Sequence, residues 1–174
     1  MGRFGEIMAA SASPTTKYAE RLLAGITADQ FARFARPGGV LVHSNHPAFI
    51  FGHLSLYPAR VLQCLNQPLG DAQPPAGFEA VFKNGVECRD DPDGTIYPPM
   101  ETVTEFFFAS YPIAFAALRH APDAVLTGPN PTEGRMRDMF PTLGAMLGFY
   151  LDGHAQSHLG QLSAWRRMMG LPAA

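Results

Sequence analysis

Apolar residues recur at helical spacing along four stretches of the chain, and no convincing set of strands accompanies them. The first stretch covers residues 4–26. Pro14 interrupts it, and because proline lacks the N–H that a helix interior needs, we expect a kink or break near Ser13. The apolar stripe of this stretch consists of Ile7, Met8, Tyr18, Leu22, Leu23 and Ile26.

The second helical stretch begins at Ser44 and Asn45 and continues to Leu65. Asn45 is the expected N-cap, since its side chain can accept a hydrogen bond from the first turn. Pro47 then falls in that first turn, where proline is tolerated. Pro58 lies inside the stretch, and we expect it to bend the helix.

The third and fourth stretches cover residues 102–118 and 142–169. Thr102 and Glu105 have the spacing of a capping box at the start of the third helix. Gly170 and Pro172 form a stop signal after the fourth. The third helix is crowded with large side chains that we expect to pack in the core: Phe106, Phe107, Phe108, Tyr111, Phe115 and Leu118.

Two long segments rich in proline and glycine, residues 66–99 and 121–141, connect the second helix to the third and the third to the fourth. A connection as long as residues 66–99 is unusual and often functional. We expect Phe78, Val81 and Phe82 to anchor it through a short helical turn. Neither flank would form a core alone, so we predict a single domain over residues 1–174. Four helices with long connections predict an all-α fold, a four-helix bundle.

Composition narrows the classes of partner. The 174 residues are 47% hydrophobic and 16% charged, which is typical of a globular protein. A net charge of −2 with no large Lys/Arg cluster argues against nucleic acid as a partner. No apolar run is long enough to span a membrane and no signal peptide is evident, so we expect a cytoplasmic protein. Cys64 and Cys88 are expected to be reduced, without a disulfide framework.

His154 and His158 are the most informative residues of the chain. Residues at i and i+4 of a helix share one face, about 6 Å apart along the axis. Leu151 and Leu162 place this pair near an apolar face, where an unpaired imidazole is costly. Each ring therefore needs a partner. Spacing and burial leave two alternatives open, a bound metal ion or ordinary hydrogen bonds in the core.

His53, on the predicted second helix, is a third candidate ligand. Helix bundles build metal sites in their cores from side chains on facing helices. Three neutral imidazoles suit Zn, Ni, Fe or Cu and poorly suit Ca or Mg. Three protein ligands also leave a position for water or substrate, as in catalytic zinc sites. The sequence lacks the HExxH pattern, so a metalloprotease is disfavoured.

Four further residues are candidates for a substrate pocket around the three histidines. Tyr57 follows His53 by four positions, and Tyr150 precedes His154 by four, so each falls on the face of its histidine. Gln161 follows His154 by seven and shares its face. Each of these three either lines the pocket or packs in the core. His46 either contacts substrate or acts as an acid or base, or it is a helix-start or surface residue.

The chain resembles the DinB/YfiT-like superfamily in two elements, NHPAFIFGHL at residues 45–54 and HAQSHLGQL at residues 154–162. The order of the helices fits as well. The resemblance implies an up-down-down-up four-helix bundle in which His53, His154 and His158 bind a divalent metal. It also implies a possible homodimer. Characterised members include metal-dependent thiol transferases and maleylpyruvate isomerases.

Two functions follow from these observations. The first is an enzyme in which a divalent metal (Zn, Ni or Fe) activates a thiol or water, as a thiol-dependent S-transferase or a hydrolase. It would act on a small molecule, with a low-molecular-weight thiol as possible co-substrate. The second is a non-catalytic metal-binding or stress-associated helical protein. A third, weaker alternative is a metal-free helical dimer. No residue stands out as a dedicated nucleophile, and the catalytic residues stay unassigned.

Overall fold

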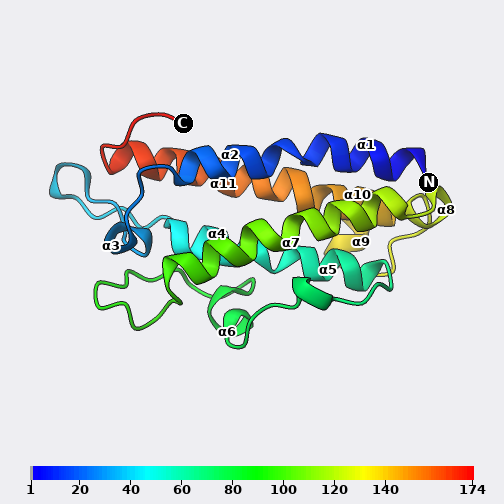
Figure 1. Cartoon of the computed structure of the whole chain (residues 1–174), viewed down its shortest axis with the longest axis horizontal. Coiled ribbons are helices and arrows are strands. Elements are labelled where there is room, and N and C mark those ends of the chain that lie inside the picture. Colours follow the sequence, from blue (N-terminus) through cyan, green and yellow to red (C-terminus); the bar gives the residue numbers. More distant parts are fainter. Residues whose placement is uncertain (1) are drawn as a thin grey trace.

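A computed structural model describes residues 2–174 of the chain, and it is built almost entirely of helices (Figure 1). Between residues 2 and 174 there is no strand, only an isolated bridge between Pro129 and Thr142. The all-α prediction is therefore confirmed. The helices are α1 Arg3–Ala12, α2 Pro14–Leu23, α3 Ala28–Phe31, η1 Pro37–Gly39, α4 Pro47–Ser55, α5 Tyr57–Cys64, η2 Gly70–Ala72, α6 Phe78–Phe82, α7 Met100–His120, α8 Asp123–Leu126, α9 Arg135–Met139, α10 Leu143–Gly148, η3 Phe149–Gly153 and α11 His154–Met168.

Four long helical stretches run along the long axis of the molecule: α1–α2, α4–α5, α7 and α10–η3–α11 (Figure 1). The first stretch contacts α7 and the α10–η3–α11 stretch, and α4–α5 contacts the same two. The first and fourth stretches run in one direction in Figure 1, and the second and third run in the opposite direction. One cluster of buried apolar residues draws members from all four.

The kink or break predicted near Ser13 is confirmed, and the second stretch, where Pro58 was expected to bend the helix, is also interrupted. The first stretch divides at Ser13, one residue before Pro14. The second divides at Leu56, two residues before Pro58. Leu56 keeps helical dihedral angles, φ −77° and ψ −19°, so the face of α4 continues into α5.

The helix starts differ from two predictions. The N-cap of α4 is His46, whose Nδ1 accepts the N–H of Phe49, and not Asn45. Asn45 turns away and donates to Gln161 on α11 instead, a tertiary contact that outweighs its local capping preference. The third helix begins at Met100, directly after Pro99, so the predicted capping box at Thr102 is wrong. Thr142 does cap the fourth stretch by accepting the N–H of Ala145.

The apolar stripe predicted for α1 is only partly buried. Ile7 is 66% exposed, whereas Gly5, Ala9 and Ala12 form the buried face. Small residues occupy the buried face because α1 packs closely on α7. A Cβ at Gly5 would collide with the carbonyl oxygen of Leu118.

The topology of the four stretches explains the length of segment 66–99. Because α4–α5 and α7 run in the same direction, the chain must return along the molecule between them (Figure 1). The predicted helical turn is confirmed as α6, whose Phe78 and Phe82 are buried while Val81 is partly buried. These two rings fix the segment against the second and third stretches, since Phe78 packs on Phe106 and Phe82 on Phe49.

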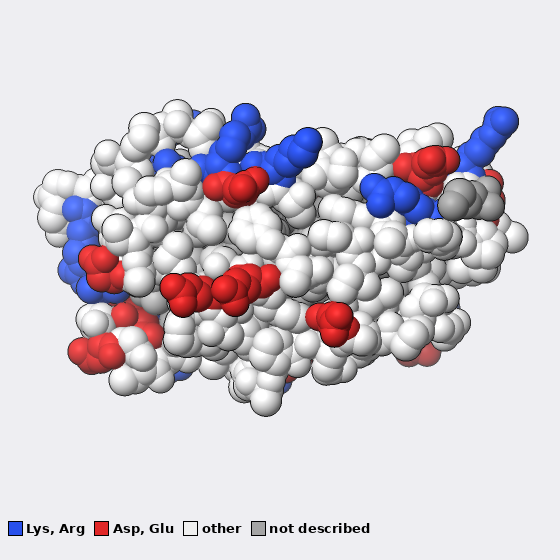
Figure 2. All heavy atoms as spheres, in the orientation of Figure 1, with Lys and Arg blue, Asp and Glu red and all other residues white. Residues whose placement is uncertain are grey.

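Charged side chains are scattered among wide uncharged areas on the face shown in Figure 2, with Lys and Arg mainly along its upper part and left end and several Asp and Glu across its middle. Among residues 2–174, no helix combines the length and apolar character needed to cross a membrane. Cys64 and Cys88 are free thiols, as expected.

Candidate metal centre

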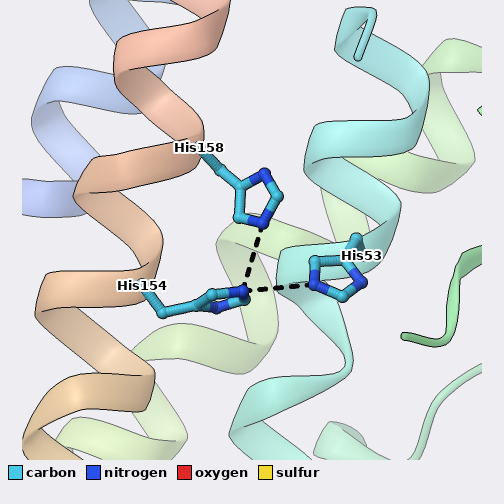
Figure 3. Close-up of side chains that lie close together, drawn as sticks. All are labelled: His53, His154 and His158. Atoms are coloured by element: carbon cyan, nitrogen blue, oxygen red, sulfur yellow. Dashed lines mark hydrogen bonds between the residues drawn. The ribbon is translucent and has the colours of Figure 1, made fainter. Parts of the chain in front are cut away.

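The structure brings together His53 from α4 and His154 and His158 from the start of α11 (Figure 3). His154 Nε2 lies 3.3 Å from His53 Nε2 and 3.1 Å from His158 Nε2. One ligand nitrogen from each ring lies within 4.8 Å of the other two. His53 is buried and the other two are half-buried. The side chains point toward one another from the two facing helices.

A hydrogen bond to the backbone of α6 orients His53. Its Nδ1 lies 2.7 Å from the carbonyl oxygen of Phe82, and since a carbonyl only accepts, Nδ1 carries the proton. The Nε2 lone pair is then free to face the other histidines. Gly52 makes this contact possible, because a Cβ there would collide with the Phe82 ring. The glycine before His53 therefore allows α6 to approach closely enough to orient the His53 ring.

His158 is oriented in the same way by a side chain. Its Nδ1 lies 3.1 Å from Gln161 Oε1, which also accepts a 2.9 Å hydrogen bond from Asn45 Nδ2. The amide of Asn45 holds the Gln161 carbonyl in place, and that carbonyl keeps the proton of His158 on Nδ1. Two of the three Nε2 atoms thus present lone pairs.

His154 shows that hydrogen bonds alone do not satisfy the cluster. Its Nε2 faces the lone pairs of both His53 and His158 and can donate a proton to only one of them, although the hydroxyl of Tyr57, 3.4 Å from His53 Nε2, can donate to His53. Its Nδ1 is buried, and within residues 2–174 it has no hydrogen-bond partner. A cation shared by the three nitrogens would satisfy all three lone pairs at once.

The spacing of the nitrogens fits a coordination sphere. Two imidazole nitrogens bound to one ion at about 2.1 Å lie about 3.0 Å apart at a right angle and about 3.4 Å apart at a tetrahedral angle. The observed 3.1 and 3.3 Å fall between these values. The cluster could therefore hold a metal ion without rearrangement of these two pairs.

The environment keeps the three rings neutral. Burial lowers the pKa of His154 to about 3, and His158, His53 and the cation of Arg60 add to this effect. Burial and the proximity of His53 lower the pKa of His158 to about 4. Burial also lowers the pKa of His53, although the Phe82 carbonyl opposes it. Neutral imidazole is the form that binds a metal, so the cluster is ready to bind one at neutral pH.

A π-helical segment that the sequence pattern did not predict leads directly into the cluster. Residues Phe149–Gly153 form η3, and α11 begins at His154. Single π turns inside α-helices are rare and often occur at functional sites. Here the wider turn places the Phe149 ring 5.7 Å from the ring of His154, five positions later.

Tyr57 adjoins the cluster, whereas Tyr150 packs on Tyr57 and not on His154. Tyr57 Oη lies 3.4 Å from His53 Nε2, and its ring centre is 4.4 Å from that of His154. The ring of Tyr150 packs 5.0 Å from Tyr57. Gln161 also adjoins the cluster, but through His158 and not through His154.

His46 does not join the cluster. It is fully buried, with Nδ1 accepting from Phe49 N–H and Nε2 donating over 2.9 Å to the Arg89 carbonyl. Both ring nitrogens are occupied, so His46 corresponds to the helix-start alternative. Two residues that orient the ligands were missed. The carbonyl of Phe82 has no sequence signal, and Asn45 was assigned to a cap.

No family model matches the chain, and a search of curated proteins finds no match. Function is therefore inferred from the three-histidine cluster and from the side chains around it.

Proposed function

We propose that the protein binds one divalent metal ion through His53, His154 and His158, in a four-helix bundle of the DinB/YfiT-like type. Convergence of three neutral Nε2 atoms around one point is the observation that carries this proposal. The run directions of the four stretches in Figure 1 support the up-down-down-up order that the resemblance implies. The single domain and the homodimer stay predictions.

We further propose that the centre is catalytic. A divalent Zn, Ni or Fe ion held by three histidines lowers the pKa of a bound water or thiol at its open position. Burial raises the pKa of Cys64, and it raises that of Cys88 to about 11, so both thiols stay protonated. Neither thiol of the chain is therefore poised as a nucleophile, which favours water or a small thiol from outside the chain. This supports a thiol-dependent S-transferase or a hydrolase acting on a small molecule.

Tyr57 is the residue of the chain best placed to assist. Its hydroxyl lies beside the cluster, and burial raises its pKa, so it remains a hydrogen-bond donor at neutral pH. A protonated phenol next to the open position can orient a substrate oxygen. Tyr150 packs against it and limits its movement.

A non-catalytic metal protein is the second candidate, because the cluster joins two long stretches. An ion bound by His53 of α4 and His154 of α11 would link residues 101 positions apart and stabilise the fold without turnover. In that case His154→Ala lowers the melting temperature and no substrate is consumed by the wild type.

Elemental analysis of the purified protein tests the metal site. We expect about one metal ion per chain in the wild type, and loss of that ion in His53→Ala and in the His154→Ala/His158→Ala double variant. His43→Ala, an exposed histidine outside the cluster, is the matched control and should retain the ion. A wild type that stays empty after incubation with Zn, Ni and Fe refutes the proposal. If the ion is retained, the loaded protein should be assayed for transfer and hydrolysis.

A further inference from the structure

A polar stripe leads away from the three histidines along the α4–α5 stretch. His53, Tyr57 and Arg60 occupy positions i, i+4 and i+7, and the helical dihedral angles of Leu56 keep them on one face. The guanidinium carbon of Arg60 lies 4.8 Å from the centre of the Tyr57 ring. Tyr57 thus contacts both the Arg60 cation and the histidine cluster.

Arg60 is close to the cluster, and no carboxylate of residues 2–174 forms an ion pair with it. The guanidinium carbon of Arg60 lies 4.8 Å from the centre of the Tyr57 ring, and the centre of the His154 ring lies 4.4 Å from it. The guanidinium and this imidazole are therefore at most about 9 Å apart. Within residues 2–174, both ion pairs join Asp90 to other arginines. Arg60 is half-buried and makes no ion pair in that part of the chain.

Arg60 also lines a cavity of about 340 Å³. The cavity lies between α5 and the segment 69–79 that returns toward α6. Its other polar side chains are Gln63, Gln73 and the exposed Glu79. Its volume falls in the range of small-molecule sites. An unpaired guanidinium is therefore available to a ligand that enters from solvent.

We propose that Arg60 binds a carboxylate of the molecule that reaches the metal centre. This inference rests on the proposed function and names the chemical class of its substrate. A guanidinium presents two parallel N–H donors that match a carboxylate, and contact with the Tyr57 ring holds it in place. Tyr57 then contacts both ends of the ligand, its carboxylate end near Arg60 and its reacting end near His53.

Both the substrate and a thiol co-substrate could supply such a carboxylate, and matched probes distinguish them. The probes are ω-mercapto acids of three to six carbons, the mercaptoalcohols of equal length, and hexanoate, which lacks the thiol. Binding is measured by calorimetry, with and without added metal. If hexanoate binds in an Arg60-dependent manner, the carboxylate alone is recognised. If only the mercapto acids do so, the ligand is a carboxylate-bearing thiol.

We expect the wild type to bind at least one mercapto acid about tenfold more tightly than the matching alcohol. Arg60→Gln should lose that preference while keeping its affinity for the alcohol, and Arg60→Lys should keep part of it. Arg167→Gln removes an exposed positive charge from α11 and is the matched control. It should behave as the wild type.

Failure of this inference is separable from failure of the metal proposal. A wild type that binds metal but shows no acid preference at any length, or an Arg60→Gln protein that retains the preference, overturns the carboxylate site. Conversely, an Arg60-dependent acid preference in a protein that binds no metal supports the carboxylate site and refutes only the metal centre. Thermal melting of Arg60→Gln verifies that the variant is folded.

Discussion

His53 donates its Nδ1 proton to the carbonyl oxygen of Phe82 over 2.7 Å, although 29 positions separate the two residues. Through this contact the short helix α6, which belongs to a connecting segment, determines which nitrogen of a candidate ligand faces the cluster. The acceptor is a backbone atom, so its position depends on how closely α6 approaches α4.

Gly52→Ala is expected to lower both stability and metal affinity. The added methyl group collides with the Phe82 ring and pushes α6 outward, at a cost of about 1–3 kcal/mol in unfolding free energy. Chemical denaturation and metal titration measure the two effects. Gly160→Ala is the matched control, because a Cβ there meets no neighbouring atom and should stabilise α11 by about 0.5–1 kcal/mol. Equal behaviour of the two variants would contradict the role assigned to Gly52.

Gln161→Ala is expected to weaken metal binding by about 10- to 100-fold, the usual effect of removing a side chain that orients a ligand. It removes the acceptor of His158 Nδ1, so that the ring can rotate or change tautomer. Competition with a coloured chelator measures the affinity. Asn45→Ala acts one step further away and should have a smaller effect. Unchanged affinity in Gln161→Ala would show that packing alone holds His158.

The metal-free protein is expected to lose stability as the pH falls below about 6.5, the ordinary pKa of histidine. His154 and His158 have folded-state pKa values of about 3 and about 4, so above pH 6.5 both rings are neutral in the folded and unfolded chains. Below pH 6.5 the unfolded chain takes up protons that the folded chain does not, and the unfolding free energy falls. The contribution of His158 is lost down to about pH 4 and that of His154 down to about pH 3, where each ring also protonates in the folded chain.

Denaturant midpoints between pH 7.5 and pH 5 test this dependence, since most carboxylates remain ionised across that window. His154→Gln/His158→Gln should show a smaller decrease than the wild type. His43→Gln is the control, since this exposed side chain lies outside the cluster. A decrease of the same size in all three proteins would assign the effect to other groups.

Chelation of the metal is expected to lower the melting temperature. An ion that binds only the folded chain adds about 4 kcal/mol at a concentration of 1,000 times its dissociation constant. For a chain of this size that corresponds to roughly 10 °C. Scanning calorimetry with and without a chelator measures the shift, and His158→Ala should show little of it. A chelator-sensitive His158→Ala protein would place the ion elsewhere.

Local features of this chain were predictable because neighbouring residues decide them. Pro14 and Pro58 mark the breaks in the first and second stretches, and Thr142 marks the start of the fourth. The spacing of His154 and His158 required only that α11 be helical. For these positions, knowledge of the partner helix adds nothing.

Features that depend on tertiary contacts were not predictable from local pattern. Asn45 has the preference of a cap, but Gln161, 116 positions away, accepts its proton. The π turn at Phe149–Gly153 has no distinctive composition. His53 was a candidate third ligand from its place on another helix, but helical periodicity does not indicate which helices face each other, so the resemblance between whole motifs gave the pairing with His154 its main support.

The sequence separation of 101 positions between His53 and His154 bears on when the protein could bind a metal ion at this cluster. During synthesis α4 leaves the ribosome long before α11, so the three nitrogens cannot meet until α11 has also emerged. The contact must also close a long loop, whose entropic cost delays it relative to local helix formation. An ion captured earlier would be held by fewer ligands and released. Binding of an ion by all three histidines would therefore follow folding, so a protein that carries the ion would be one that has completed folding.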